Sequence, residues 1–190
     1  VRGIDLCDMT WKRKFSPRSA DPDVSLAAEN VDDSNWQEIR PPLLWEEHDF
    51  AFCRLHVNIP SSWKSQKIRL LIGAIDDNDI TYLNGVQIGK TDGWDTQREY
   101  TLPKDFIHWD RDNVLCVMVD NFNFGGGLYK TPIMLLAGDN PPDTMTAKKY
   151  GIRPKQGKIG SPIPLRKMHV DKGVLKYPDG TGVSLWGTNI

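Results

Sequence analysis

Residues 73–89 read Gly-Ala-Ile-Asp-Asp-Asn-Asp-Ile-Thr-Tyr-Leu-Asn-Gly-Val-Gln-Ile-Gly, and this stretch decides the fold. Asn84-Gly85 is the dipeptide best suited to the two positive φ angles of a type I′ turn. The flanking residues, 80–83 and 86–88, are mainly β-branched, aromatic or aliphatic, as strands prefer. The stretch therefore predicts a β-hairpin with its apex at Asn84-Gly85 and a short second strand that ends at Gly89.

The rest of the first 137 residues also has the pattern of strands joined by turns. Residues 50–59 alternate, so that one face carries only apolar side chains, namely Ala51, Cys53, Leu55, Val57 and Ile59. Further strands are expected at residues 67–72, 113–119 and 128–136. In the last of these, Pro132 marks an edge or a bulge. Only residues 25–31 suggest a short helical turn, so the pattern predicts an all-β sandwich or jelly roll.

Composition indicates a globular domain with an uneven charge distribution. The chain has 190 residues, of which 39% are hydrophobic and 26% charged, and it has no apolar run long enough to span a membrane. Residues 1–147 carry 15 Lys and Arg against 23 Asp and Glu, whereas residues 148–190 carry 9 against 2. We expect the basic segment 148–176 to lie against the acidic body. No nucleic-acid-binding motif accompanies it, so neither a nucleic acid nor a membrane is an expected partner.

The three cysteines do not form a recognisable framework. Cys7, Cys53 and Cys116 are isolated in the sequence, without the spacing of a zinc site. Cys53 and Cys116 lie in apolar strands, where a free cysteine behaves as a small buried hydrophobe. The four tryptophans Trp11, Trp36, Trp45 and Trp63 are most simply explained by packing.

The pattern changes after residue 137. Residues 138–167 are rich in Pro, Gly and Lys and are expected to form a linker. Residues 168–190 resume strand character, with a turn at 178–180 and a new element that starts close to Ile190. We expect a larger domain to follow. The chain starts at Val1 without an initiator Met or an apolar leader, so we also expect it to come from within a longer polypeptide, although export cannot be read directly from this start.

Several motifs occur in the order found in a known type of domain. They include Asp33-Ser-Asn-Trp36, residues 73–79, Tyr82-Leu-Asn-Gly85, residues 98–103, 112–120 and Gly125-Gly-Gly-Leu-Tyr129. A strand from Leu6 to Trp11 precedes them. In these features the chain resembles the N-terminal sugar-binding-type domain of family 2 glycoside hydrolases and their relatives. The resemblance implies a galactose-binding-like jelly roll over residues 1–137. The same module is also found in sialate O-acetylesterases.

The end of the chain resembles the start of a catalytic domain. Residues 174–180 and 184–190 are similar to the lead-in hairpin and first strand of a glycoside hydrolase (β/α)8 barrel. Such a barrel needs about 250 residues and places its catalytic groups at strand ends. A retaining enzyme of this kind uses two carboxylates. The resemblance implies two glutamates on later strands, so no catalytic residue is assigned in this chain.

Three aspartates directly before the hairpin form a candidate metal site. Asp76, Asp77 and Asp79 are of the type that binds calcium through oxygen. The Gly spacing of an EF-hand loop is missing, however, and the alternative is that these side chains anchor the turn by accepting backbone hydrogen bonds. Asp77 and Asp79 are also expected to pair with Arg98. We therefore expect no cofactor other than a structural calcium ion.

A second candidate site is a surface that binds sugar. Trp94 follows the hairpin in an expected loop, and an exposed indole stacks well on the apolar face of a pyranose. Its expected companions are Asp95, Arg98, Asn123 and Tyr129. The alternative is that Trp94 covers the core and that the Gly125–127 run only permits a tight turn.

Three functions remain open from the sequence. The first is a non-catalytic accessory domain, either scaffold or sugar-binding, of a hydrolase that acts on O-glycosidic bonds. The second is a stand-alone carbohydrate-binding module. The third is the accessory jelly roll of a carbohydrate esterase. The expected partners are carbohydrate and the catalytic barrel of the same polypeptide.

Overall fold

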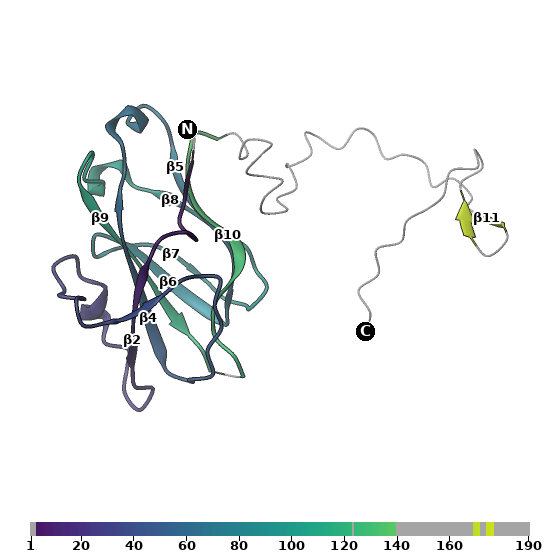
Figure 1. Ribbon diagram of the computed structural model, residues 1–190, viewed down its shortest axis with the longest axis horizontal. Coiled ribbons are helices and arrows are strands. Elements are labelled where there is room, and N and C mark those ends of the chain that lie inside the picture. Colours follow the sequence, from purple (N-terminus) through teal and green to yellow (C-terminus); the bar gives the residue numbers. More distant parts are fainter. Residues whose placement is uncertain (1–2, 123, 140–168, 172–173, 177–190) are drawn as a thin grey trace. The chain divides into compact units, whose positions relative to one another are not determined.

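Two antiparallel β-sheets form the first of two units, residues 1–154 and 155–190, in the computed structural model (Figure 1). The structure describes residues 3–122, 124–139, 169–171 and 174–176. One sheet has the order β1 (Gly3–Asp5), β10 (Gly127–Ala137), β5 (Ile68–Asp76), β8 (Arg98–Leu102). The other has the order β3 (Gln37–Ile39), β2 (Trp11–Ser16), β4 (Phe50–Asn58), β9 (Asp112–Asp120), β6 (Asn78–Leu83), β7 (Val86–Thr91). The predicted all-β fold is confirmed as a β-sandwich.

The main core lies between the two sheets. The apolar face predicted for residues 50–59 is buried there and packs with side chains of β5 such as Leu70 and Ile72. Burying this much aliphatic surface is the dominant stabilising contribution, at roughly 25 cal/mol per Å² removed from water. The four tryptophans predicted to pack are all buried, as are Cys53 and Cys116. Three short 3-10 helices, η1 (Val24–Ala27), η2 (Ser61–Trp63) and η3 (Lys104–Phe106), lie between strands.

The predicted hairpin is formed by β6 and β7. Asn84 and Gly85 have φ angles of 49° and 80°, as the turn requires. The Asn84 side chain also secures the hairpin to β9, because its Oδ1 accepts a hydrogen bond from the Val114 N–H at 2.7 Å and its Nδ2 donates to Asn113 Oδ1 at 3.0 Å. The second strand was predicted to end at Gly89, but it continues to Thr91.

Gly89 is required by a neighbour in space. A Cβ atom at this position would lie 2.1 Å from the ring of Tyr100. The glycine therefore leaves room for a buried aromatic side chain from β8, which explains why a residue that favours strand ends lies inside a strand.

Of two other sequence expectations, the one for residues 6–11 needs correction, and the one for Pro132 is confirmed in one of its two alternatives. The alternating stretch from Leu6 to Trp11 is not a strand. The chain leaves β1 at Asp5, turns, and enters β2 in the other sheet at Trp11, whose indole Nε1 donates to the Leu6 carbonyl at 2.9 Å. Pro132 lies in β10 between β1 and β5, so it marks a bulge and not an edge: the register with β5 shifts on both sides of Lys130.

Residues 24–36 form a strap over the outer face of the six-stranded sheet. They include η1, which matches the predicted helical turn, and they bury Ala27 and Trp36 against Phe52, Tyr82 and Met118. Part of the second face of β4 is thereby removed from water as well. Phe52 and Arg54, which the alternation alone would place in solvent, have no exposed surface.

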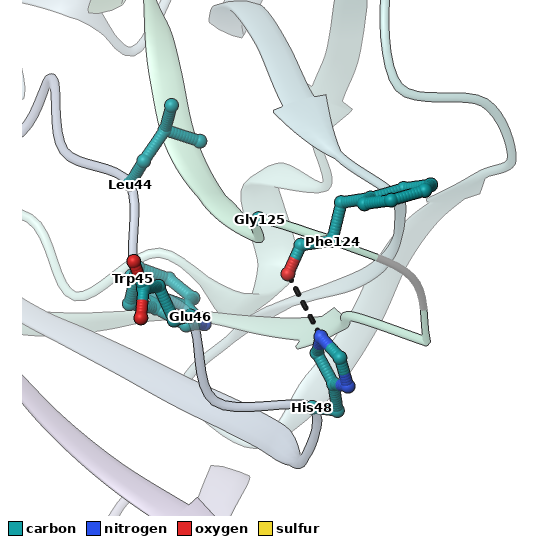
Figure 2. A pocket seen from close by; sticks show the side chains of 6 residues that line it. All are labelled: Leu44, Trp45, Glu46, His48, Phe124 and Gly125. Atoms are coloured by element: carbon teal, nitrogen blue, oxygen red, sulfur yellow. Dashed lines mark hydrogen bonds between the residues drawn. The ribbon is translucent and has the colours of Figure 1, made fainter.

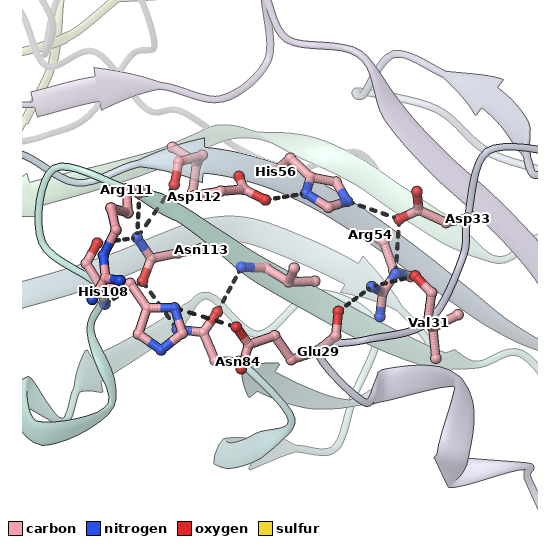
Figure 3. A network of polar contacts seen from close by, with 12 residues as sticks. Glu29, Val31, Asp33, Arg54, His56, Asn84, His108, Arg111, Asp112 and Asn113 are labelled. Atoms are coloured by element: carbon pink, nitrogen blue, oxygen red, sulfur yellow. Dashed lines mark hydrogen bonds and ion pairs between the residues drawn. The ribbon is translucent and has the colours of Figure 1, made fainter.

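The side chain of Arg54 holds the strap in place through the backbone carbonyls of the strap (Figure 3). Its Nε donates to Asp33 Oδ2 at 2.9 Å, and its two terminal nitrogens donate to four strap carbonyls. These belong to Leu26, Ala28, Glu29 and Val31. One guanidinium thus satisfies backbone groups that a short irregular segment leaves unpaired.

His56 adds a pH-dependent contact to the same strap. Its ring nitrogens contact Asp112 Oδ2 at 2.5 Å and Asp33 Oδ2 at 3.1 Å (Figure 3). Burial alone would lower the pKa of His56, but the hydrogen bonds to Asp112 and Asp33 outweigh burial and raise it above 6.5. For Asp33, burial opposes the effect of Arg54 and His56, and these partners lower its pKa below 3.8.

This arrangement predicts a bounded pH window for strap stability. The His56 contribution is fully present below pH 6.5 and is lost as pH rises through its raised pKa. The Asp33 contribution is present above pH 3.8 and is lost as pH falls through its lowered pKa. Chemical unfolding of the unmodified chain and of His56→Gln should therefore show a stability difference that is larger at about pH 5.5 than at about pH 9. A difference that does not change with pH would contradict the assignment.

The second unit is described only in part. β11 (His169–Asp171) pairs with β12 (Val174–Lys176) in an antiparallel hairpin. The chain thus reverses before the turn predicted at 178–180, which lies outside the described residues. So do most of the predicted linker at 138–167, most of the basic segment 148–176 and the expected barrel strand. In the part of the chain that the structure describes, no helix has the length and apolarity to cross a membrane.

Candidate functional site

The acidic turn before the hairpin supports a buried ion pair. Arg98 Nε donates to Asp79 Oδ1 at 2.8 Å, and neither side chain has exposed surface. Thr81 Oγ1 and the Tyr100 hydroxyl donate to Asp79 Oδ2 at 2.8 and 2.9 Å. The predicted pairing of Arg98 with Asp79 is confirmed. Asp77 takes part through its backbone carbonyl, which accepts from Arg98 Nη2 at 3.0 Å.

These contacts do not fit a calcium site. Both oxygens of Asp79 already accept hydrogen bonds inside the sandwich, and Asp77 Oδ2 accepts from the Phe122 N–H at 3.2 Å. Within residues 3–139, apart from residue 123, no three carboxylate, imidazole or thiol groups are arranged to hold a metal ion. Asp77 accepts a backbone hydrogen bond, as the turn-anchor alternative requires, whereas Asp79 accepts from side chains. Calcium binding stays a prediction from the sequence.

Three of the predicted sugar-site residues lie together. The Tyr129 hydroxyl donates to the Trp94 carbonyl at 3.0 Å, and the Trp94 side chain is 58% exposed. Burial raises the pKa of Tyr129, and the nearby carboxylates of Asp76 and Asp95 raise it further. The structure thus brings Trp94, Asp95 and Tyr129 to one place. Arg98 lies beneath them without exposed surface, and Asn123 is outside the described residues.

A pair of carboxyl groups borders this cluster. Burial raises the pKa of Asp76 to about 6, and the hydrogen bond and negative charge of Asp77 contribute to the rise. Two adjacent carboxyl groups cannot both ionise freely, which is why the pKa of Asp76 rises. When protonated, Asp76 can donate a hydrogen bond as well as accept one, which suits the hydroxyl groups of a sugar.

An open hollow lies beside the loop between β9 and β10 (Figure 2). It has a volume of about 810 Å³ and is lined by Leu44, Trp45, Glu46, His48, Phe124 and Gly125. Two backbone hydrogen bonds of 2.8 Å between Trp45 and Gly126 join its two walls, and His48 Nε2 contacts the Phe124 carbonyl at 2.9 Å. Gly126 is required here, since a Cβ atom would lie 2.4 Å from Asn121.

The cluster and the hollow share the loop between β9 and β10. Phe122 contacts Asp77 on one side of this loop, and Phe124 lines the hollow on the other. The described residues include six large apolar side chains that are strongly exposed. Four of them belong to this region, namely Leu44, Trp94, Phe122 and Phe124. We call these four the aromatic end. An apolar surface gathered in this way indicates a contact site.

Sequence reasoning found one of the four residues of the aromatic end. It named Trp94 and the Gly125–127 turn, but it missed Phe122 and Phe124, which are 48% and 88% exposed. Their exposure could have been inferred from the presence of two phenylalanines in a Gly-rich turn, because such a turn offers few buried positions for a large side chain. Leu44 had no such signal, because its exposure depends on the Trp45–Gly126 bridge.

Several solved glycosidases have a similar fold in one part of their chains. A β-glucuronidase from Bacteroides uniformis is 25% identical with a TM-score of 0.62, over 72% of this chain and 18% of that one. A family 2 glycosyl hydrolase from Bacteroides cellulosilyticus is 20% identical, with a TM-score of 0.61 over 72% and 21%. A β-glycosidase from Bacteroides vulgatus is 21% identical, with a TM-score of 0.59 over 72% and 20%. No protein-family model matches the sequence, and neither does a curated protein.

The likeness is confined to a small part of each glycosidase. This chain spans about a fifth of the solved chains with which it aligns. The matches show the β-sandwich fold and suggest an accessory domain of a glycoside hydrolase.

Proposed function

We propose that the chain is a non-catalytic accessory domain of a glycoside hydrolase that acts on the O-glycosidic bonds of β-linked glycans. The observation that carries this proposal is the match to 72% of this chain but only 18–21% of glycosidase chains. A secreted or periplasmic location is part of the proposal, since glycans of this kind are met outside the cytoplasm.

The aromatic end supports the role of a domain that contacts another surface. It combines exposed apolar side chains with the Asp76–Asp77 pair and the open hollow. We propose that it faces the catalytic barrel of the same polypeptide. In that position it stabilises the barrel and shapes the rim of the substrate cleft.

The residues that follow Ile190 in the parent polypeptide test this proposal. A (β/α)8 barrel with glutamates at the ends of two strands would support the hydrolase. A domain with a Gly-Asp-Ser-type nucleophile would instead support a carbohydrate esterase and would contradict the hydrolase.

A second candidate function is direct carbohydrate binding. It is favoured by the 58% exposed indole of Trp94 beside Tyr129 and Asp95, a combination that suits stacking on a pyranose. Titration calorimetry with soluble β-linked oligosaccharides should then show saturable binding, and Trp94→Ala should weaken it by about tenfold or more.

Phe106→Ala is a matched control, because Phe106 is 45% exposed but does not belong to the aromatic end. It should leave the affinity unchanged. If the unmodified chain produces no saturable heat with any oligosaccharide, the domain is a scaffold and not a binding module.

A further inference from the structure

Three of the four most deeply buried arginines have a carboxylate partner. Arg54, Arg69 and Arg98 are at most 6% exposed. Each guanidinium lies within 3.0 Å of a carboxylate oxygen, from Asp33, Glu99 and Asp79 respectively. Each also donates to at least one backbone carbonyl. The fold thus follows the general rule that a buried charge is paired.

Arg13 is the exception. It is 7% exposed, yet no carboxylate within the described residues comes within 4.0 Å of its guanidinium. Its one hydrogen-bond acceptor in that part of the chain is the neutral side chain of Gln37, with Nη2 donating to Oε1 at 2.6 Å. Arg13 Nε is buried and has no acceptor.

The aromatic neighbours of Arg13 lie over the plane of its guanidinium. The guanidinium carbon lies 4.5 Å from the ring centre of Phe15 and 4.8 Å from that of Trp45. Aromatic contacts of this kind occupy the faces of the guanidinium plane, whereas carboxylates bind in the plane through its N–H groups. Trp45 Nε1 is a second buried donor without an acceptor. Two unpaired donors and an unpaired charge therefore occur in neighbouring side chains.

The position in the sheet provides access. Arg13 is on β2, and only the three-residue strand β3 lies between it and the sheet edge. Gln37, which covers the guanidinium there, is itself exposed on β3. Its side chain can rotate away at small cost and be replaced by a stronger acceptor.

We propose that Arg13 anchors a carboxylate-binding site at the β2–β3 edge and that its ligand is a sugar acid. The need for a carboxylate follows from the four arginines alone. The choice of a sugar acid rests on the proposed function, because a domain of a glycan-degrading enzyme meets such groups on its substrates.

Titration of the 190-residue chain at constant ionic strength tests the site, with D-glucuronate, acetate and D-glucose as probes. D-glucuronate should bind saturably and more tightly than acetate, and D-glucose should not bind. Arg13→Gln should weaken glucuronate binding by at least about tenfold, since hydrogen bonds to a charged group are lost. Arg13→Lys should be intermediate, because it keeps the charge but not the planar fork. Arg40→Gln, at an exposed arginine, should have no effect.

A second variant keeps the test valid if Arg13→Gln folds poorly. Gln37→Glu places an internal carboxylate where Oε1 is 2.6 Å from Nη2. It should raise the melting temperature and weaken glucuronate binding by at least about tenfold, because the anchor is then occupied. Equal binding by the unmodified chain and both variants, or no binding at all, would overturn the site. Acetate binding as tight as glucuronate binding would overturn the sugar-acid assignment. None of these results bears on the hydrolase proposal.

Discussion

Replacing Asp79 with Asn should lower the free energy of unfolding by about 3–5 kcal/mol, as breaking a buried ion pair does. Arg98 has no exposed surface, so its charge would remain buried without a counter-charge. The hydroxyls of Thr81 and Tyr100 would also lose a charged acceptor. Urea unfolding followed by far-ultraviolet circular dichroism measures the change.

Two controls separate the ion pair from a general effect of losing an aspartate. Asp95→Asn removes an exposed carboxylate from the same region and should change stability by less than about 0.5 kcal/mol. The double variant Asp79→Leu with Arg98→Met removes both charges and should be less destabilised than Asp79→Asn. A loss below about 1 kcal/mol in Asp79→Asn would contradict the buried pair.

Replacing Arg54 with Met should cost a similar amount, about 3–5 kcal/mol, for a different structural reason. The substitution leaves Asp33 without its closest partner and removes the donors to four carbonyls of the strap. Because the strap covers Phe52 and Met118, its release also exposes apolar surface. Hydrogen exchange should therefore increase first in residues 24–36.

Lys12→Met is the matched control for this result. Lys12 pairs with Glu38 at 2.9 Å on the surface of the same sheet, and exposed pairs contribute about 0–1 kcal/mol. If Arg54→Met leaves exchange in the strap unchanged, the guanidinium is not what holds it.

Local patterns in the sequence predict the parts of this fold that depend on near neighbours. The Asn84-Gly85 turn requires two positive φ angles, and the alternation of residues 50–59 sets one buried face. Both are properties of short segments. The pairing of Arg98 with Asp79 was also predicted, although the two residues lie in different sheets, Asp79 on β6 and Arg98 on β8.

Features that depend on distant residues were wrong or missed. Gly89 appeared to end a strand because nothing in its neighbourhood indicates the ring of Tyr100 above it. The Trp45–Gly126 bridge, which joins segments about 80 residues apart in the sequence, was missed for the same reason.

The measurement that tests the central claim most directly is glycosidase activity of two polypeptides on the same panel of aryl β-glycosides. One is the 190-residue chain, and the other is the proposed parent polypeptide, in which the catalytic barrel follows this chain. We predict no turnover above buffer by the 190-residue chain and multiple turnovers by the longer one. Multiple turnovers by the 190-residue chain alone, abolished by Asp76→Asn with Asp77→Asn, would show that its own carboxyl pair is catalytic and would contradict an accessory role.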